Sequence, residues 1–235
     1  KVGAKTFPMW TPRFTIAYRR EDGPLLSGSI AKGAKAGGFN AAAPTPGELP
    51  FEPETNWTYE LGLKSQWPDR RLLLNLAIFD SEMEGIQITN QSPNGPAVFI
   101  TRNGGSGRSR GFELETAYRP TDHWACSFTY SLADARFKQA TDSSLRSYPS
   151  FALQQDVAGQ SLPRQAKHLV NGSVEYQRPA SRGVEFYSRV DGRYESKKNG
   201  FTHTSLGWVG ARTIVNARIG LRSTHWGAAL WGSNL

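Results

Sequence analysis

Four histidines are the side chains in this 235-residue chain most able to bind a metal ion. They are His123, His168, His203 and His225, and they lie on different segments without the short spacing of a zinc site. A single cysteine, Cys126, excludes a thiolate metal cage and an internal disulfide framework. The sequence therefore predicts neither a metal site nor a cofactor.

A glycine-rich run, Gly105–Gly111, is the second candidate for chemistry. Its second gap is too long for a dinucleotide-binding loop, and it lacks the Gly-Lys-Ser/Thr of a phosphate-binding loop. It also precedes a predicted strand, whereas both of those loops precede a helix. We therefore predict a flexible external loop at this place.

Serines, histidines and carboxylates give no catalytic signature. A serine–histidine hydrolase on a barrel is conceivable with His123 or His168, but no paired acid supports it. Glu113 and Glu115 share one strand face. Equally spaced carboxylates are common on the lumen walls of barrels, so we do not interpret these two as an acid/base pair. No enzyme is predicted, and an assay of lipid hydrolysis tests the alternative of an outer-membrane hydrolase.

Strands with alternating apolar and polar residues hold these side chains. In one of them the apolar and polar positions alternate through Trp57, Thr58, Tyr59, Glu60, Leu61, Gly62, Leu63 and Lys64. Two further strands are predicted at about Arg13–Arg20 and Leu25–Lys32. Many of the roughly ten strands approach the length of about 9–11 residues that a tilted strand needs to cross a bilayer.

The connections between the strands differ greatly in length. Tight turns are predicted at Pro68–Arg70, Pro120–Asp122, Pro179–Arg182 and Ser223–His225. Long polar loops are predicted over residues 81–108, 138–163 and 196–211. Tight turns at one end of every hairpin and long loops at the other are typical of an outer-membrane β-barrel, whereas a soluble sandwich spreads its loop lengths more evenly.

The two faces of these strands require different surroundings. Ionised residues on the polar faces, such as Glu60, Arg189 and Arg218, cannot lie unpaired in a dry core, so they must meet water at a surface or in a lumen. The apolar faces carry large aromatic residues near the tight turns, namely Tyr18, Trp67, Tyr118, Trp124, Tyr176 and Trp226. They are typical of an interfacial girdle, and the alternative is the core of a soluble β-rich binding protein that needs no detergent.

Composition further limits the class of protein to which the chain can belong. With 38% hydrophobic residues and no stretch near 18 apolar residues, the chain is not a helical membrane protein. The net charge of +8 suits a nucleic-acid binder, but the charges are spread over every turn and loop, and no recognised motif is present. We predict no nucleic-acid partner. Cations facing a lumen or the phosphates of lipopolysaccharide explain the charge equally well.

Several segments resemble, in order and spacing, the barrel of TonB-dependent outer-membrane receptors. They are Ser29–Asn40, which ends in Gly-Gly-Phe-Asn, Phe51–Glu54, Trp57–Ser65, Asn75–Phe79, Gly85–Gln87, Asn103–Gly105, Arg110–Glu115 and Leu230–Leu235. The chain departs from the family at Ala34, where the usual GYKSGGFN run has Tyr. We also expect no plug domain, no TonB box and no closing strand in this chain.

The resemblance implies an all-β fold: an antiparallel up-and-down transmembrane β-barrel that is partial, with about ten of the family's 22 strands. Residues 1–235 would form one partial barrel domain. The complete receptor would lie in the outer membrane of a Gram-negative bacterium, among lipid and lipopolysaccharide. It would bind a scarce nutrient such as a ferric siderophore, an iron chelate, and import it with energy from the TonB complex, which it would contact through the missing N-terminal region.

Ligand contacts are expected in the long external loops. Arginine and aromatic side chains suit an anionic, partly aromatic chelate. The candidates are Phe99, Arg102, Arg108, Arg136, Tyr148, His203 and Trp208. The alternative is that these side chains bind lipopolysaccharide or only solvate the loops.

Overall fold

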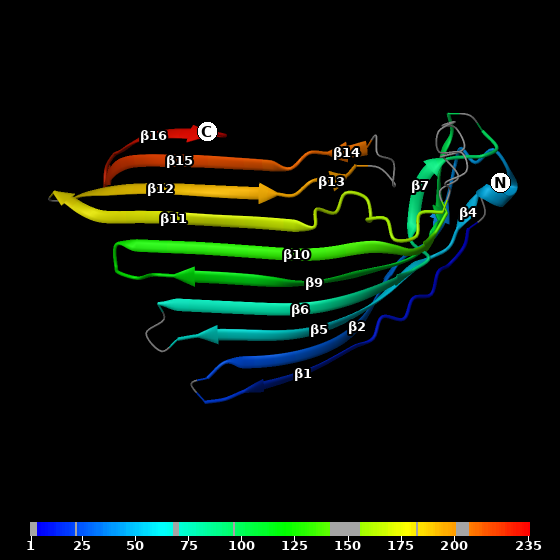
Figure 1. Cartoon of the computed structure of the whole chain (residues 1–235), viewed down its shortest axis with the longest axis horizontal. Coiled ribbons are helices and arrows are strands. Elements are labelled where there is room, and N and C mark those ends of the chain that lie inside the picture. Colours follow the sequence, from blue (N-terminus) through cyan, green and yellow to red (C-terminus); the bar gives the residue numbers. More distant parts are fainter. Residues whose placement is uncertain are drawn as a thin grey trace.

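Ten strands form a single antiparallel sheet in the computed structural model of the chain (Figure 1). The structure describes residues 4–21, 23–67, 71–95, 97–141, 156–181, 183–200 and 207–235. The strands of the sheet are, in spatial order, β1 (Arg13–Arg19), β2 (Leu25–Lys35), β5 (Glu54–Gln66), β6 (Leu72–Glu84), β9 (Gly105–Tyr118), β10 (Trp124–Ala140), β11 (His168–Ser181), β12 (Val184–Glu195), β15 (Arg212–Ser223) and β16 (Gly227–Ser233). Spatial order follows sequence order, so the predicted up-and-down arrangement of about ten strands is confirmed.

Three small two-stranded sheets are formed by segments that connect the long strands in sequence. They pair β3 (Gly38–Phe39) with β4 (Pro50–Phe51), β7 (Gln87–Gln91) with β8 (Phe99–Asn103), and β13 (Lys198–Asn199) with β14 (Trp208–Val209). A short 3₁₀ helix, η1 (Pro46–Glu48), precedes β4. In the described part of the chain, no helix is long and apolar enough to cross a membrane.

Strand register divides the sheet into two faces. Residues directly opposite one another in an antiparallel pair lie on the same face, so Leu61, Ile78 and Phe112 form one cross-strand row. We call this side, which also carries Leu76 and Phe128, the apolar face. The other side carries Glu60, Glu113, Glu175, Arg189 and Arg218, and we call it the hollow face.

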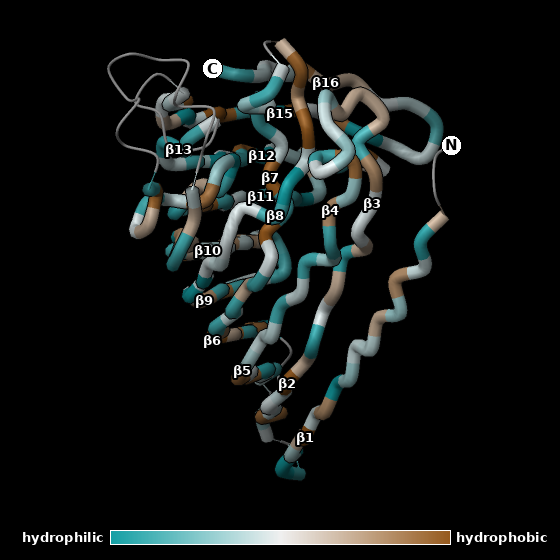
Figure 2. Tube along the Cα trace, turned by 90° about the vertical axis from the view of Figure 1, so that its right-hand side faces the viewer, coloured by the Kyte–Doolittle hydropathy of each residue, from teal (hydrophilic) through white to brown (hydrophobic). Residues whose placement is uncertain are grey.

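The sheet curves, and the β7–β8 hairpin lies on the concave side of the curve (Figure 2). Ile88 of this hairpin belongs to a cluster with Phe137 and Leu162, against which Met83 packs. Met83 and Phe137 are one residue out of phase with the apolar face, so the cluster lies on the hollow face. The curved sheet thus has polar side chains and one hairpin inside, and apolar side chains outside.

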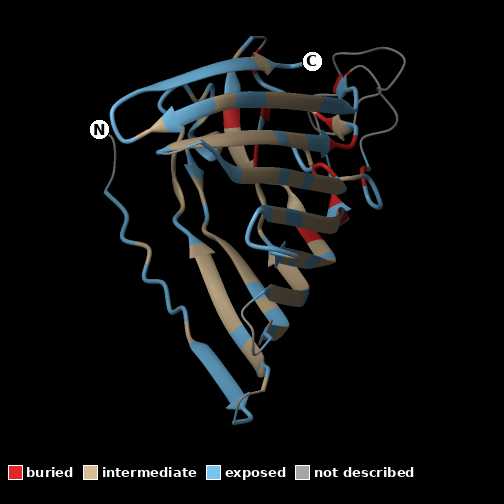
Figure 3. Ribbon diagram, turned by 90° about the vertical axis from the view of Figure 1, so that its left-hand side faces the viewer, coloured by how far each residue is buried: buried red, intermediate tan, exposed pale blue. Residues whose placement is uncertain are grey.

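Few described residues are buried, and no second layer covers the apolar face in the described part of the chain (Figure 3). Leu61 is 67% exposed, Ile78 is 53% exposed and Phe128 is 41% exposed. A soluble protein does not leave such a continuous apolar surface in water. The alternative of a soluble β-rich binding protein does not agree with this surface, because these residues would lie in its core.

Tight turns join the strands at one end of the sheet. The turn predicted at Pro120–Asp122 lies between β9 and β10, and the turn predicted at Ser223–His225 begins one residue later, because β15 continues to Ser223. Of the turn predicted at Pro179–Arg182, the residues Pro179–Ser181 belong to β11, and Arg182 lies outside the described residues. The turn predicted at Pro68–Arg70 lies outside the described residues.

The opposite end requires two corrections. The loop predicted over residues 81–108 includes the end of β6 and the start of β9, and β10 extends to Ala140, inside the loop predicted from residue 138. The flexible loop predicted at Gly105–Gly111 is wrong, since this run is strand β9, paired with β6 and β10. Gly105 has φ 132°, and a Cβ atom there would overlap the carbonyl oxygen of Gln139, so the glycine permits close pairing at a bulge.

Candidate functional site

The hollow face carries rows of polar side chains that bond to one another across the strands. Ser127 and Ser173 share a hydrogen bond of 2.7 Å between their hydroxyl oxygens, and Asn171 Nδ2 donates to Thr129 Oγ1 at 2.9 Å. Asn75 Nδ2 donates to Glu115 Oε2 at 3.0 Å. Such pairs satisfy polar groups on a surface that faces water and leave it able to bind polar molecules.

Arg189 on β12 is the centre of an ionic group on this face. Its NH1 atom lies 3.4 Å from Glu175 Oε2, and its Nε atom lies 3.4 Å from Asp191 Oδ1. Asn216 Nδ2 donates to the other oxygen of Asp191 at 2.8 Å. Three neighbouring strands, β11, β12 and β15, are therefore linked by side chains as well as by their backbones.

A second ionic group lies nearer to the tight turns. Arg222 Nε donates to Glu185 Oε2 at 2.7 Å, and Arg222 NH2 donates to Gln177 Oε1 at 3.1 Å. The Tyr187 ring lies between two guanidinium groups, with Arg218 Cζ 5.4 Å and Arg222 Cζ 5.3 Å from its centroid. Cations on an aromatic face remain able to attract an anion or a carboxylate from a partner surface.

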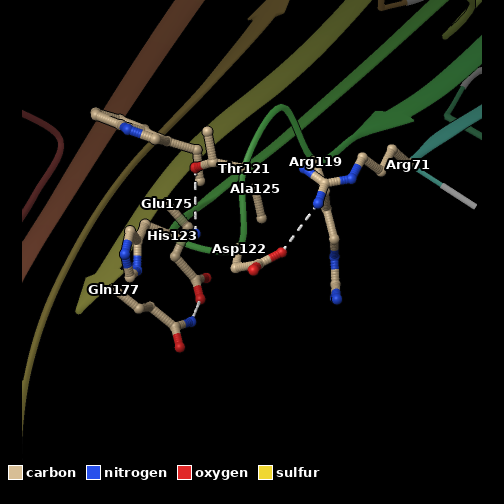
Figure 4. Close-up of a pocket in the computed structure, with 9 residues that line it drawn as sticks. Arg71, Arg119, Thr121, Asp122, His123, Ala125, Glu175 and Gln177 are labelled. Carbon is tan, nitrogen blue, oxygen red and sulfur yellow. Dashed lines mark hydrogen bonds and ion pairs between the residues drawn. The ribbon is translucent and has the colours of Figure 1, made fainter. Parts of the chain in front are cut away.

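A polar cavity of about 460 Å³ opens at the tight-turn end (Figure 4). Arg71, the residue before β6, donates to Asp122 Oδ1 at 3.2 Å and to the carbonyl oxygen of Pro120 at 3.0 Å. Arg119, the residue after β9, and Glu175 of β11 also line the cavity. Its walls combine guanidinium groups with carboxylates, so a polar protein segment suits this cavity better than an apolar ligand.

At the loop end, two segments far apart in sequence form one platform. Asn40 Nδ2 donates to the carbonyl oxygen of Thr101 at 2.8 Å, and its Oδ1 accepts from the Thr101 amide at 2.8 Å. Asn103 Nδ2 donates to the carbonyl oxygens of Glu52 and Gly85, each at 2.8 Å. These contacts fix the β7–β8 hairpin on the segment that precedes β5.

A carboxylate strengthens the same platform. Glu48 accepts from Ser92 Oγ at 2.7 Å and from Thr45 Oγ1 at 3.0 Å. The hydrogen bond from Ser92 is the main cause that holds the pKa of Glu48 below its ordinary value, with smaller contributions from Thr45, Asn94 and Arg102. The ionised form of Glu48 is thus the one that fits the platform.

Two predicted ligand residues lie on this hairpin. Phe99, at the start of β8, is 67% exposed. Arg102 is half-buried, and its NH2 atom donates to Asn90 Oδ1 at 2.9 Å. The structure therefore places an exposed ring and a partly covered guanidinium three residues apart on a fixed hairpin.

Two other predicted ligand residues are not in loops. Arg108 lies in β9 and Arg136 in β10, opposite each other in the register. Both lie on the apolar face, in phase with Ile78 and Phe112, so they do not join Phe99 in the hollow. The prediction of loop positions was wrong because charged residues continue these strands beyond their apolar part.

One of the three remaining predicted ligand residues is described by the structure. Trp208, on β14, is 46% exposed, and Lys197 Nζ lies 5.2 Å from the centroid of its ring. Tyr148 and His203 fall outside the described residues. Among the residues that are described, no group of three or more His, Cys, Asp or Glu side chains is placed to hold a metal ion.

Sequence reasoning missed the platform and the ionic groups of the hollow face. The platform depends on Asn40 and Thr101, which are 61 residues apart, so no local pattern signals their contact. The ionic groups depend on strand register, which places Glu175 opposite Arg189. The alternation of charged and apolar residues along these strands was the available signal in the sequence. It indicated only that Glu175 and Arg189 meet water.

Comparison with known proteins agrees with this geometry. A family model described as "TonB dependent receptor-like, beta-barrel" matches residues 1–235. The solved structure of the ferric yersiniabactin uptake receptor FyuA from Yersinia pestis has a TM-score of 0.74 and 18% identity, over 95% of this chain and 31% of that chain. The ferric-catecholate import receptor Fiu from E. coli K12, in its closed form, has a TM-score of 0.66 and 21% identity, over 95% of this chain and 30% of that chain.

A third structure, the siderophore receptor PiuA from Acinetobacter baumannii, has a TM-score of 0.65 and 19% identity, over 93% of this chain and 30% of that chain. The TM-scores show that the fold is shared. This chain spans about a third of the length of the receptors that it matches.

Proposed function

Because this chain belongs to the TonB-dependent receptor β-barrel family, whose members are outer-membrane proteins, we propose that it forms part of the barrel wall of a nutrient transporter. The single observation that carries the proposal is the division of one curved sheet into an uncovered apolar face and a polar hollow face. Lipid on one side and water on the other satisfy both faces. Hydrogen bonds between strands then satisfy the backbone within the hydrocarbon.

The nutrient that we propose is an anionic iron chelate of the siderophore class. The relatives FyuA and Fiu are named as a ferric yersiniabactin receptor and a ferric-catecholate receptor. Arg102 and Phe99 on the fixed hairpin, together with Trp208 and Lys197, offer the cations and rings that such a chelate requires. Tyr148 and His203 stay proposed contacts of the same site.

The partners of the complete protein follow from the same proposal. A plug domain would occupy the hollow, where the cavity beside Arg71 and Glu175 suits a polar protein segment. The TonB complex would act on a region outside residues 1–235, which we propose are one partial barrel domain. Outer-membrane lipid and lipopolysaccharide would cover the apolar face. We propose no enzymatic activity, in keeping with relatives that are named as receptors.

Ligand binding by the complete receptor tests the proposed site. We expect Arg102→Ala and Trp208→Ala each to weaken binding of the chelate about tenfold, or about 1.4 kcal/mol, because each removes a cation or ring contact. A ferric catecholate and a ferric hydroxamate are titrated in turn, with binding followed by quenching of tryptophan fluorescence. Arg19→Ala, at the tight-turn end of β1, is the matched control. Affinity that is unchanged in Arg102→Ala and Trp208→Ala for a chelate that the wild type binds would remove these residues from the site.

A further inference from the structure

On the apolar face, the cross-strand rows of β6, β9 and β10 change from apolar to charged at one level. From the tight-turn end the rows are Leu72–Tyr118–Cys126, Leu74–Thr116–Phe128, Leu76–Leu114–Tyr130, Ile78–Phe112–Leu132, Asp80–Arg110–Asp134 and Glu82–Arg108–Arg136. The last two rows contain no apolar residue. On the side that faces lipid, the side chains of all three strands therefore change from apolar to charged at the same level.

The position of these rows agrees with the edge of the membrane. From Leu72 to Asp80 the strand rises about 26 Å along its axis, or about 20 Å perpendicular to the bilayer at the usual tilt. The apolar band of such barrels is about 25 Å tall, so the charged rows lie near its outer boundary. Trp57 of β5 is opposite Glu82 in the register, and tryptophan on this face marks the interface between lipid and water.

Carboxylates hold several of the cations in place. Arg108 forms a two-point ion pair with Asp80, with Nε donating to Oδ1 at 2.7 Å and NH2 donating to Oδ2. Lys138 Nζ donates to Glu82 Oε1 at 2.9 Å. The first pair joins the neighbouring strands β6 and β9, the second joins β6 to β10 across β9, and each fixes a cation at the surface.

Further cations complete the group. Asp134 accepts from Arg136 Nε at 2.9 Å and from Lys167 Nζ at 3.2 Å. Arg110 is exposed and, among the residues that the structure describes, makes no hydrogen bond or ion pair, although it lies between Asp80 and Asp134 in the register. We call Arg108, Arg110, Arg136, Lys138, Lys167 and the three carboxylates the outer charged patch.

A depression of about 480 Å³ lies in the outer charged patch. Arg108, Arg110, Arg136 and Lys138 line it, together with Asp134 and the apolar side chain of Leu132. Five cations and three carboxylates leave the outer charged patch with an excess of two positive charges. Glu84, one row farther from the membrane on β6, faces the same side but does not line the depression.

We infer that the outer charged patch binds a phosphate group of a glycolipid in the outer leaflet, that is, the lipid A part of lipopolysaccharide. The acyl chains of such a lipid would lie on Ile78, Phe112 and Leu132, and its phosphate would enter the depression next to Arg110. Guanidinium groups suit a phosphate because they donate two parallel hydrogen bonds to its oxygens. This inference rests on the proposed placement of the chain in the outer membrane.

Ion pairing between strands does not account for Arg110. Exposed ion pairs that join strands contribute little to stability in water. Arg110 adds a guanidinium that joins no pair, beside an apolar side chain and at the level of the lipid headgroups. An anion supplied by the membrane neutralises the excess charge without loss of the existing ion pairs.

The test uses the complete receptor that contains this chain, purified in detergent and stripped of lipid. Native mass spectrometry measures its binding of lipid A carrying two phosphates, one phosphate or none. The variants are Arg110→Gln, which breaks no ion pair, and Arg110→Gln combined with Lys138→Gln. Lys64→Gln is the matched control, because Lys64 is an exposed cation on the hollow face.

We expect the double variant to bind bisphosphorylated lipid A at least tenfold more weakly, Arg110→Gln to show an intermediate loss, and Lys64→Gln to bind as the wild type does. Lipid A without phosphate should bind the wild type as weakly as the double variant binds the full lipid. Equal binding of all variants, or of all three lipids, would overturn the inference. Fractionation of the receptor with outer membranes is scored separately, so that failure of the proposed function is distinguished from failure of this site.

Discussion

At the scale of single residues, Glu48 makes the loop platform sensitive to acid. The pKa of Glu48 is lowered from its ordinary value of 4.5, so the folded platform favours the ionised carboxylate over the protonated carboxyl. The stabilisation is therefore complete above that value and is lost as the pH falls through the lowered pKa of the folded state. Below this window the protonated carboxyl accepts more weakly from Ser92, and the contact between η1 and the β7–β8 hairpin weakens.

Ser92→Ala tests this dependence, because it removes the largest cause of the shift. We expect the pKa of Glu48 to rise toward 4.5 in this variant, measured by carbon NMR of selectively labelled glutamate between pH 2.5 and 7 in the complete receptor. Thr89→Ala removes a hydrogen bond to Thr101 on the same hairpin without touching Glu48, and it should leave the titration unchanged. A Glu48 titration that is the same in all three proteins would show that Ser92 does not set its pKa.

At the scale of strands, the two faces of β6 should respond oppositely to charge. Leu76 lies between Leu63 and Leu114 in the middle of the apolar face, and Leu73 lies on the hollow face of the same strand. We expect Leu76→Arg to destabilise the complete receptor by about 2–4 kcal/mol, because arginine would meet hydrocarbon there. Leu73→Arg should cost less, because its charge reaches water. Urea unfolding in lipid vesicles measures the difference, and equal losses would contradict the assignment of the faces.

Strand faces were predictable from the sequence, but strand ends were not. Alternation at Trp57–Lys64 places every side chain on its observed face, because a two-residue period needs no distant information. The ends of β6 and β9 were missed because Asp80, Glu82, Arg108 and Arg110 make both faces polar, a pattern that also marks loops. Side-chain contacts over long separations, such as Asn40 with Thr101, depend on how the hairpins fold back, which no local period contains.

At the scale of the whole molecule, the sheet depends on surroundings outside residues 1–235. Its apolar face is uncovered, and its buried cluster is a small group around Phe137 at the loop end. In the described part of the chain, β1 and β16 each have a strand partner on only one side. Such edges present unpaired N–H and C=O groups, which are very costly in hydrocarbon. Lipid and neighbouring strands must therefore contribute much of the stability that a soluble domain obtains from its own core.

Refolding residues 1–235 alone tests this dependence. We expect the isolated chain to form oligomers in detergent micelles, because the open edges of β1 and β16 pair with those of other copies. Light scattering measures the mass, and hydrogen exchange measures the protection of the amides of Thr15, Ala17 and Trp231, which alternate with the amides that bond to β2 and β15. In the complete receptor, the protein should be monomeric and the same amides should exchange slowly, since each edge strand would have a second neighbour. A monodisperse monomer of the isolated chain, with those amides already protected, would contradict the view that these edges need further strands.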